Sequence, residues 1–211
     1  MMLKISQNGR SMVEMLAVLA IIGVLSAGGL AGYGKAMYKY ELSKTISITN
    51  QALQDFAFFK NRGVSGYSAT KANMAETARS SGLMSDCRPM QSQIASGYGV
   101  CQAPLGEIYP RFFISTSAGD QYYTYMLYVT LLKNMRVACM NFLAQNWDQA
   151  LPQKFWRLGK IWITSNKGSQ VIYSGGSGGI SVASTITPCK NVCGDGATYC
   201  SVVFDFSGYA N

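Results

Sequence analysis

Of the 211 residues, 48% are hydrophobic and only 13% are charged, which excludes a disordered protein, because disordered chains have few hydrophobic residues and many charges. Eighteen Lys and Arg against ten Asp and Glu give a net charge of +8, which suits an anionic partner or surface without proving one. Histidine is absent, so Ser-His-Asp and Cys-His nucleophiles and histidine metal ligands are excluded, and we expect neither an enzyme of the common hydrolytic kinds nor a bound cofactor.

The first predicted element is an uncharged stretch over residues 15–34. Twenty residues at about 1.5 Å per residue can cross a bilayer core of about 30 Å as a helix. The polar leader before it carries Lys4 and Arg10, which predicts a cytoplasmic N-terminal side and export of residues 36–211. The alternative is a cleaved secretory signal, although its apolar core is normally about 7 to 15 residues long.

The helical pattern continues beyond the uncharged stretch. Leu42, Ile46, Leu53 and Phe56 recur at helical spacing with charged and polar residues between them, which indicates an amphipathic helix. We therefore expect one helix over residues 11–60, apolar on all sides in its first part and on one stripe in its second.

The remaining chain predicts a mixed globular domain with helices and strands. The expected elements, in chain order, are a short helix over 71–80, a strand over 108–115, a second helix over 125–147, a hairpin of 160–164 and 169–174, and a strand over 200–206 with one face more buried. Cys139 would lie on the apolar side of the second helix and could pin it to the sheet.

Six cysteines follow the apolar stretch, and an even number in an exported segment favours a disulfide framework. They are Cys87, Cys101, Cys139, Cys189, Cys193 and Cys200. Six cysteines allow 15 pairings, of which local loop closure favours Cys87 with Cys101. Two of the C-terminal three would pair with each other or with Cys139. The competing interpretation is a zinc site at the C-terminal three, whose spacing matches no usual ligand pair closely, and we expect no metal.

The residues Gly9-Arg10-Ser11-Met12-Val13-Glu14, followed by an apolar helix, resemble the N-terminus of type IV pilins and pseudopilins. The long exported part and the Ser-Ala-Gly-Gly stretch at 26–29 lean towards the type IVb branch. The resemblance implies that a prepilin peptidase cuts between Gly9 and Arg10, and that the new terminus is a candidate for N-methylation. It also implies that Glu14 pairs with the α-amino group of Arg10 in a neighbouring subunit. The alternative for Glu14 is a side chain that snorkels to the headgroups.

The resemblance further implies an α+β fold, in which a long N-terminal helix packs on an antiparallel β-sheet. The expected parts are a leader over 1–9, a transmembrane and filament-core helix over 10–34, its amphipathic continuation over 35–62, and a disulfide-bonded globular domain over 63–211. The implied partners are copies of itself or related pilins, the peptidase, the inner-membrane assembly machinery and, before assembly, the membrane. The implied location is the bacterial inner membrane and then an extracellular pilus or a periplasmic pseudopilus.

Several alternatives stay open. The subunit could be a major pilin, a minor pilin or a pseudopilin of a type II secretion system. A DNA-uptake receptor is a further possibility, because basic residues gather around the predicted hairpin and could bind phosphates; they are Lys154, Arg157, Lys160 and Lys167. A membrane-tethered enzyme is less favoured, because Glu107 and Asp120 do not have the spacing of a catalytic carboxylate pair, and we assign no catalytic residue.

Overall fold

The structure is a computed structural model that describes residues 12–61, 88–91, 99–117, 120–145, 147, 157–174 and 180–209. The side chains of residues 55–61, 88–91, 99–100, 112–117, 120–125, 157, 182 and 207–209 are not described. The predicted helix over 71–80 lies outside the described residues. The chain divides into two units, Met1–Tyr40 and Glu41–Asn211, which are treated separately below.

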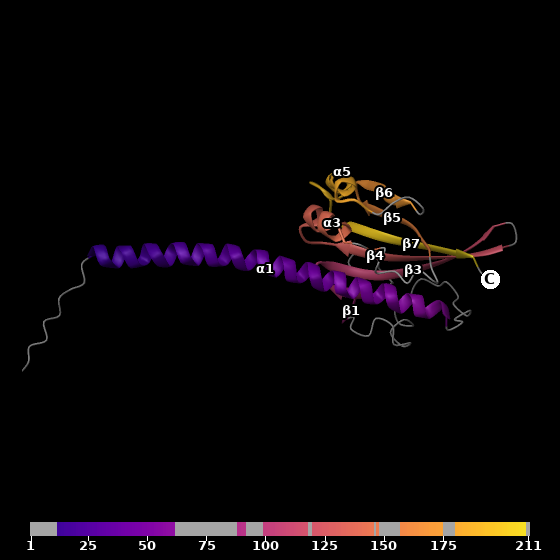
Figure 1. Cartoon of the computed structure of the whole chain (residues 1–211), viewed down its shortest axis with the longest axis horizontal. Coiled ribbons are helices and arrows are strands. Elements are labelled where there is room, and N and C mark those ends of the chain that lie inside the picture. The colour runs from indigo at the N-terminus through magenta and orange to yellow at the C-terminus, as the bar shows by residue number, and fades with distance from the viewer. Residues whose placement is uncertain are drawn as a thin grey trace, which may run out of the picture. The chain divides into compact units, whose positions relative to one another are not determined.

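Helix α1 runs without a break over Met12–Asn61, which confirms the long N-terminal helix (Figure 1). Its second half buries a stripe at spacings of three and four residues, which is the pattern of one helix face. The stripe consists of Thr45, Ile48, Thr49, Ala52 and Leu53. It is rotated from the predicted one, since Leu42 and Ile46 are only half-buried.

Seven antiparallel strands of the described residues form one sheet in the order β1-β2-β3-β4-β7-β5-β6. The strands are β1 Arg88–Gln91, β2 Gly99–Ala103, β3 Gly106–Ser117, β4 Asp120–Leu131, β5 Arg157–Ser165, β6 Gly168–Ser174 and β7 Cys200–Tyr209. The predicted strands at 108–115 and 200–206 and the predicted hairpin are all present. The α+β class with an antiparallel sheet is therefore confirmed.

The predicted helix over 125–147 is wrong in its first third, because residues up to Leu131 belong to β4. Leu127, Val129 and Leu131 alternate along that strand, and all three are completely buried. Asn134 then adopts a left-handed conformation (φ 45°, ψ 42°), and helix α3 begins only at the next residue, over Met135–Leu143. A left-handed residue cannot continue a right-handed helix, so the strand and the helix are separate elements.

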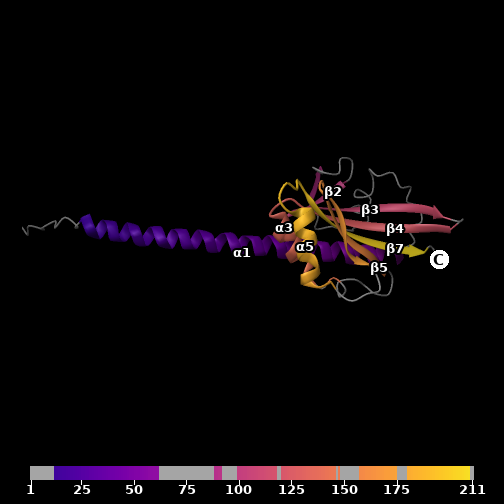
Figure 2. The same cartoon turned by 90° about the horizontal axis from the view of Figure 1, so that it is seen from above.

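Helices cover the sheet on both faces. Figures 1 and 2 show the second half of α1 on one side of the sheet, and α3 and α5 (Val182–Cys193) on the other. On the α3 side, the Phe204 ring lies 5.0 Å from the Trp147 ring and 6.2 Å from the Phe142 ring, centroid to centroid. Trp147 also donates its indole N–H to the Phe142 carbonyl at 2.9 Å, so this aromatic cluster joins α3 to the sheet.

Strand β7 is buried on both of its faces, not mainly on one as the alternation predicts. Val202 and Phe204 are completely buried, and so are their neighbours on the opposite face, Ser201 and Val203, to within 1%. The hydroxyl groups of Ser201 and Thr130 lie 2.7 Å apart, which satisfies two polar groups that burial would otherwise leave without water. The second helical layer explains why both faces are covered.

Candidate assembly surface

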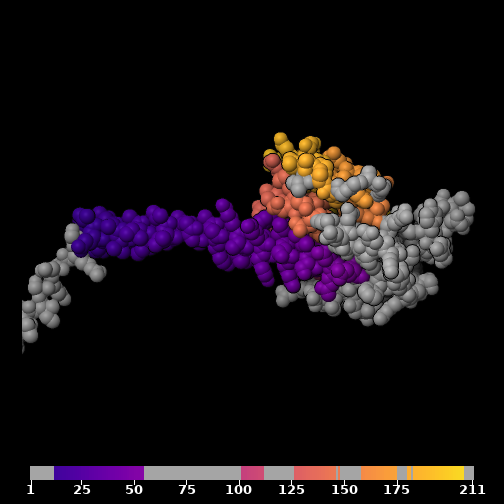
Figure 3. Space-filling model, in the orientation of Figure 1, coloured from indigo at the N-terminus to yellow at the C-terminus, as the bar shows by residue number. Residues whose placement is uncertain are grey.

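The first half of α1 exposes apolar side chains on all sides. The thirteen large apolar residues between its start and Met37 are between 39% and 82% exposed, and Figure 3 shows this indigo segment uncovered on the side in view. They are Met12, Val13, Met15, Leu16, Val18, Leu19, Ile21, Ile22, Val24, Leu25, Leu30, Tyr33 and Met37. Within the described part of the chain, α1 is the one helix long and apolar enough to span a membrane. A helix that is apolar all round requires lipid or other helices around it.

Glu14 is the only charged residue between Met12 and Gly34, and it lies in the first turn of α1. A carboxylate in the first turn interacts favourably with the positive end of the helix dipole. Its predicted partner Arg10 and the predicted cleavage residue Gly9 lie outside the described residues. Cleavage and the pairing of Glu14 therefore stay predictions.

Five glycines lie in the apolar half of α1, and the helix continues through all of them. A Cβ atom placed on any of them would meet no atom within 4 Å. They are Gly23, Gly28, Gly29, Gly32 and Gly34. Contacts with the described residues thus do not require glycine at these positions, whereas small residues allow a second helix to approach the backbone closely.

A polar contact joins the second half of α1 to the turn between β2 and β3. Thr45 donates its hydroxyl proton to the Glu41 carbonyl at 2.8 Å, and its Oγ1 accepts the backbone N–H of Leu105 at 3.3 Å. Thr49 donates in the same way to the Thr45 carbonyl at 2.8 Å. Both threonines therefore have a hydrogen-bond partner for their hydroxyl group within the helix, which allows these polar side chains to be buried in the stripe of α1.

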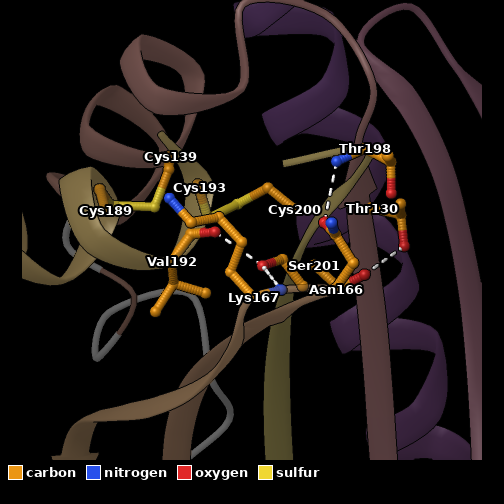
Figure 4. The surroundings of a disulfide bond; sticks show 11 residues. Thr130, Cys139, Asn166, Lys167, Cys189, Val192, Cys193, Thr198, Cys200 and Ser201 are labelled. Carbon is orange, nitrogen blue, oxygen red and sulfur yellow. Dashed lines mark hydrogen bonds between the residues drawn. A yellow bond between two sulfur atoms is a disulfide. The ribbon is translucent and has the colours of Figure 1, made fainter. Parts of the chain in front are cut away.

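Two disulfides hold the C-terminal region together (Figure 4). Cys139 bonds Cys189, which joins α3 to α5, and Cys193 bonds Cys200, which joins the end of α5 to the start of β7. The expectation that Cys139 pins its helix to the sheet is therefore wrong, because its partner lies on another helix. Cys101 is disulfide-bonded as well.

Cys87, the predicted partner of Cys101, lies outside the described residues, so that pairing stays a prediction. The sulfurs of Cys139, Cys193 and Cys200 lie within 4.8 Å of one another. Such a cluster could suggest a metal site, but all three sulfurs are committed to disulfide bonds and none is a thiolate, the form in which cysteine binds zinc. The zinc interpretation is thus wrong for this structure.

The turn between β5 and β6 contacts the loop enclosed by the second disulfide. Asn166 donates its side-chain amide to the Gly196 carbonyl at 3.1 Å and accepts the Thr198 N–H at 2.9 Å. Lys167 donates its ammonium group to the Asp195 carbonyl at 2.9 Å. The predicted anion-binding residue Lys167 therefore holds the C-terminal loop in its own chain.

The other predicted basic residues have separate surroundings. Lys160 is exposed on β5, directly opposite Asp205 of β7. Burial raises the pKa of Asp205, and the nearby Lys160 ammonium lowers it in part. Lys154 lies outside the described residues, and the side chain of Arg157 is not described. Phosphate binding by these four residues stays a prediction.

Glu107 and Asp120 are placed far apart, at opposite ends of the β3–β4 hairpin. Glu107 is opposite Thr130, and Asp120 is opposite Ser117 beside the hairpin turn. Strand residues rise about 3.3 Å each, so ten positions separate the two backbones by about 30 Å. They do not form a catalytic carboxylate pair, in agreement with the sequence spacing.

No protein-family model matches the sequence, and no curated protein matches it. Among solved structures, a crystal structure of a type IVb pilin from Salmonella typhi aligns with a TM-score of 0.45 and 17% identity, covering 74% of this chain and 95% of that one. An NMR structure of the type IVb pilin PilS from Salmonella typhi aligns with a TM-score of 0.43 and 17% identity, covering 77% and 94%. Both structures come from the family that the N-terminal residues resemble.

Proposed function

We propose that this chain is a structural, non-catalytic subunit of a type IV pilus or a related filament, and that it assembles through the first half of α1. The observation that carries the proposal is the apolar helix surface between Met12 and Met37, which is exposed on all sides. Burying a large apolar side chain stabilises a protein by about 1.5 to 3 kcal/mol. The thirteen exposed side chains therefore strongly favour transfer of this helix from water to an apolar environment. A bilayer supplies that environment to the precursor, and the helices of other subunits supply it in the filament.

Glu14 would set the register of the subunits. A carboxylate costs about 2.5 to 3.5 kcal/mol towards the centre of a bilayer, so it favours a cationic partner once the helix leaves the headgroup region. Cleavage after Gly9 would create that partner, the α-amino group of Arg10 in a neighbouring subunit. Apolar packing alone is non-directional, whereas an ion pair at one position selects one axial offset between helices.

The proposed route begins with insertion in the bacterial inner membrane and cleavage by a prepilin peptidase, with the globular unit on the exported side. The inner-membrane assembly machinery would then move the subunit into an extracellular pilus or a periplasmic pseudopilus. Disulfides in the C-terminal region support export, because such bonds persist in oxidising compartments. N-terminal sequencing of the mature protein should give Arg10 as the first residue.

The test is a comparison of Glu14→Ala with Glu41→Ala in native cells. Each variant removes one carboxylate from α1, but only the first removes it from the apolar half. We expect Glu14→Ala to insert in the membrane at normal or slightly higher levels and to lose filaments in the sheared fraction, while Glu41→Ala assembles normally. Normal filament yield in Glu14→Ala at equal subunit levels would show that the carboxylate only snorkels.

Minor pilins and type II secretion pseudopilins share this proposed mechanism and are alternatives within it. A DNA-uptake receptor would use Lys154, Arg157 and Lys160. Charge reversal of these three residues should then lower the affinity for DNA and make that affinity depend less steeply on salt concentration, while filaments still form. A membrane-tethered enzyme is the least supported alternative, because Glu107 and Asp120 lie at opposite ends of a hairpin.

A further inference from the structure

Four of the cysteines form a single cluster in the interior of the globular unit. The disulfides Cys139–Cys189 and Cys193–Cys200 lie side by side (Figure 4), and the sulfurs of Cys139, Cys193 and Cys200 are within 4.8 Å of one another. None of the four residues is more than 1% exposed. They are called the sulfur cluster below.

The sulfur cluster forms because α5 presents two cysteines from consecutive turns. Cys189 and Cys193 are four positions apart on that helix, so their Cβ atoms lie on one face, about 5 to 6 Å apart. That face is buried. Cys139 lies on the buried face of α3 and is bonded to the first cysteine of the pair, while the second is one turn further along. Either cysteine of α5 is therefore a short distance from the Cys139 sulfur.

The separations within the sulfur cluster are short enough for exchange between the two bonds. Nonbonded heavy atoms touch at about 3.5 to 4.0 Å, so two sulfurs within 4.8 Å need to approach by about 1 Å to reach contact. A thiolate attacks a disulfide at one sulfur and displaces the other. Burial slows attack by thiols from solvent. An attacking sulfur inside the cluster needs no access from solvent, because its reaction is intramolecular.

We propose that the sulfur cluster is a thiol–disulfide exchange site, in which Cys139 bonds either Cys189 or Cys193. In a first step, an external dithiol reduces the Cys193–Cys200 bond to two thiols and is itself oxidised to a disulfide. The Cys193 thiolate then forms a bond to the Cys139 sulfur, the bond from Cys139 to Cys189 breaks, and the electron pair leaves on Cys189. Cys189 takes up one proton and Cys193 has released one, so the second step consumes no oxidant or reductant.

Exchange keeps α3 linked to α5 after one disulfide has been lost. The new bond joins the same two helices one turn further along α5, whereas β7 loses its covalent attachment to α5. Loss of Cys189 has a related outcome, because the Cys139 thiolate then attacks Cys193 and displaces Cys200. Two different losses thus lead to the same bond, Cys139–Cys193.

The test uses two variants of the full chain, Cys200→Ser and Cys189→Ser, each of which leaves one thiol of the cluster beside an intact disulfide. Each variant is purified in a mild detergent and held at about pH 8.5, where about half of ordinary cysteines are thiolates. The samples are then quenched in acid and mapped by mass spectrometry without reductant. We expect the Cys139–Cys193 bond in at least about a tenth of the molecules of both variants. Reaction of the remaining thiol with external glutathione should be at least about tenfold slower than this exchange.

Cys101→Ser is the matched control, because it breaks a disulfide outside the sulfur cluster. Cys101 lies on β2, three strands away from β7, which corresponds to about 14 Å. A thiol released there is too far from the cluster to exchange with it, so this variant should keep Cys139–Cys189 and Cys193–Cys200 in nearly all molecules. In concentrated urea, further pairings should appear in all three variants, which shows that the mapping detects them.

Absence of the Cys139–Cys193 bond from the folded variants would overturn the inference, and so would its appearance in the Cys101→Ser control. Bonds from the cluster to Cys101 would also overturn it, because they would show exchange in an unfolded chain. Thermal unfolding, recorded at the pH of the exchange, establishes which variants are folded, and either of the two can carry the test alone. Filament yield does not enter this experiment, so its failure would leave the proposed function unaffected.

Discussion

The hydroxyl group of Thr45 joins two parts of the chain that lie 60 residues apart, because its oxygen accepts the backbone N–H of Leu105 at 3.3 Å. The same hydroxyl donates to the Glu41 carbonyl at 2.8 Å. Thr45 is 1% exposed and Leu105 is completely buried, so water cannot replace either bond. One threonine thus attaches α1 to the turn between β2 and β3.

Thr45→Val should therefore destabilise the globular unit while preserving the shape of the side chain. The substitution leaves the buried Leu105 N–H without an acceptor, which costs about 2 kcal/mol. Thr45→Ser keeps the hydroxyl and should cost less than half as much. Urea unfolding of the full chain in detergent measures both values, and a Thr45→Val chain as stable as the natural one would show that the hydrogen bond to Leu105 does not matter.

Gly106→Ala should disrupt the start of the β3–β4 hairpin. An added Cβ would lie 1.9 Å from the Thr130 carbonyl oxygen, which is backbone and cannot move aside without breaking the ladder. We expect a loss of about 3 kcal/mol or more, in the range of severe overpacking. Gly32→Ala is the control, because a Cβ there meets nothing within 4 Å and alanine favours helix by about 1 kcal/mol. A Gly106→Ala chain with an unchanged melting temperature would contradict the close approach.

The two described disulfides should differ in their contribution to stability. The Cys139–Cys189 bond closes a loop with a sequence separation of 50, and the Cys193–Cys200 bond one of 7. Loop-closure entropy predicts about 4 kcal/mol for the long loop and about 2.5 kcal/mol for the short one. Paired Cys→Ala variants, compared by urea unfolding, measure the difference.

Mass mapping without reductant should find these two bonds and a third between Cys87 and Cys101; a Cys139–Cys200 bond would contradict the structure.

Asp205 should make stability fall as the pH rises. Burial raises the pKa of its carboxyl group, and its Oδ1 is buried without a hydrogen-bond partner. The folded state therefore binds the proton more tightly than the unfolded state, so the contribution is present below the ordinary value of 3.8 and is lost as the pH rises through the raised pKa. Asp205→Asn, which cannot ionise, should gain stability relative to the natural chain as the pH rises from 3.8 through the raised pKa of Asp205. An opposite trend in urea midpoints would indicate that Lys160 outweighs burial.

The N-terminal helix could be predicted from the sequence because its signals agree with one another. The uncharged stretch over 15–34 and the amphipathic pattern after it both indicate helix, and α1 follows them to Asn61. The precise buried stripe could not be predicted, since Thr45 and Thr49 are polar residues on the covered face. Their burial depends on hydrogen bonds to the helix backbone and to Leu105, which spacing does not reveal.

Strand β4 and helix α5 were harder to predict, for different physical reasons. Residues 125–132 are almost continuously apolar, so periods of two and of 3.6 fit them equally well, and partners across the sheet select the strand. Helix α5 was missed because serine, threonine and β-branched residues dominate its first half and Pro188 lies inside it. Its two disulfides supply the stability that its composition lacks. The N-cap Ser181, which accepts the Ser184 N–H at 3.2 Å, was the one local signal.

The position of β7 in the sheet has a consequence for the order in which the sheet forms. This strand is the last in chain order, yet it lies between β4 and β5 and pairs with both. Until residues 200–209 are available for pairing, the sheet exists only as two separate pieces with open edges, which are prone to non-native pairing. The sheet therefore closes only after its last strand is available, and a chain that stops before Cys200 leaves the edges of β4 and β5 unpaired.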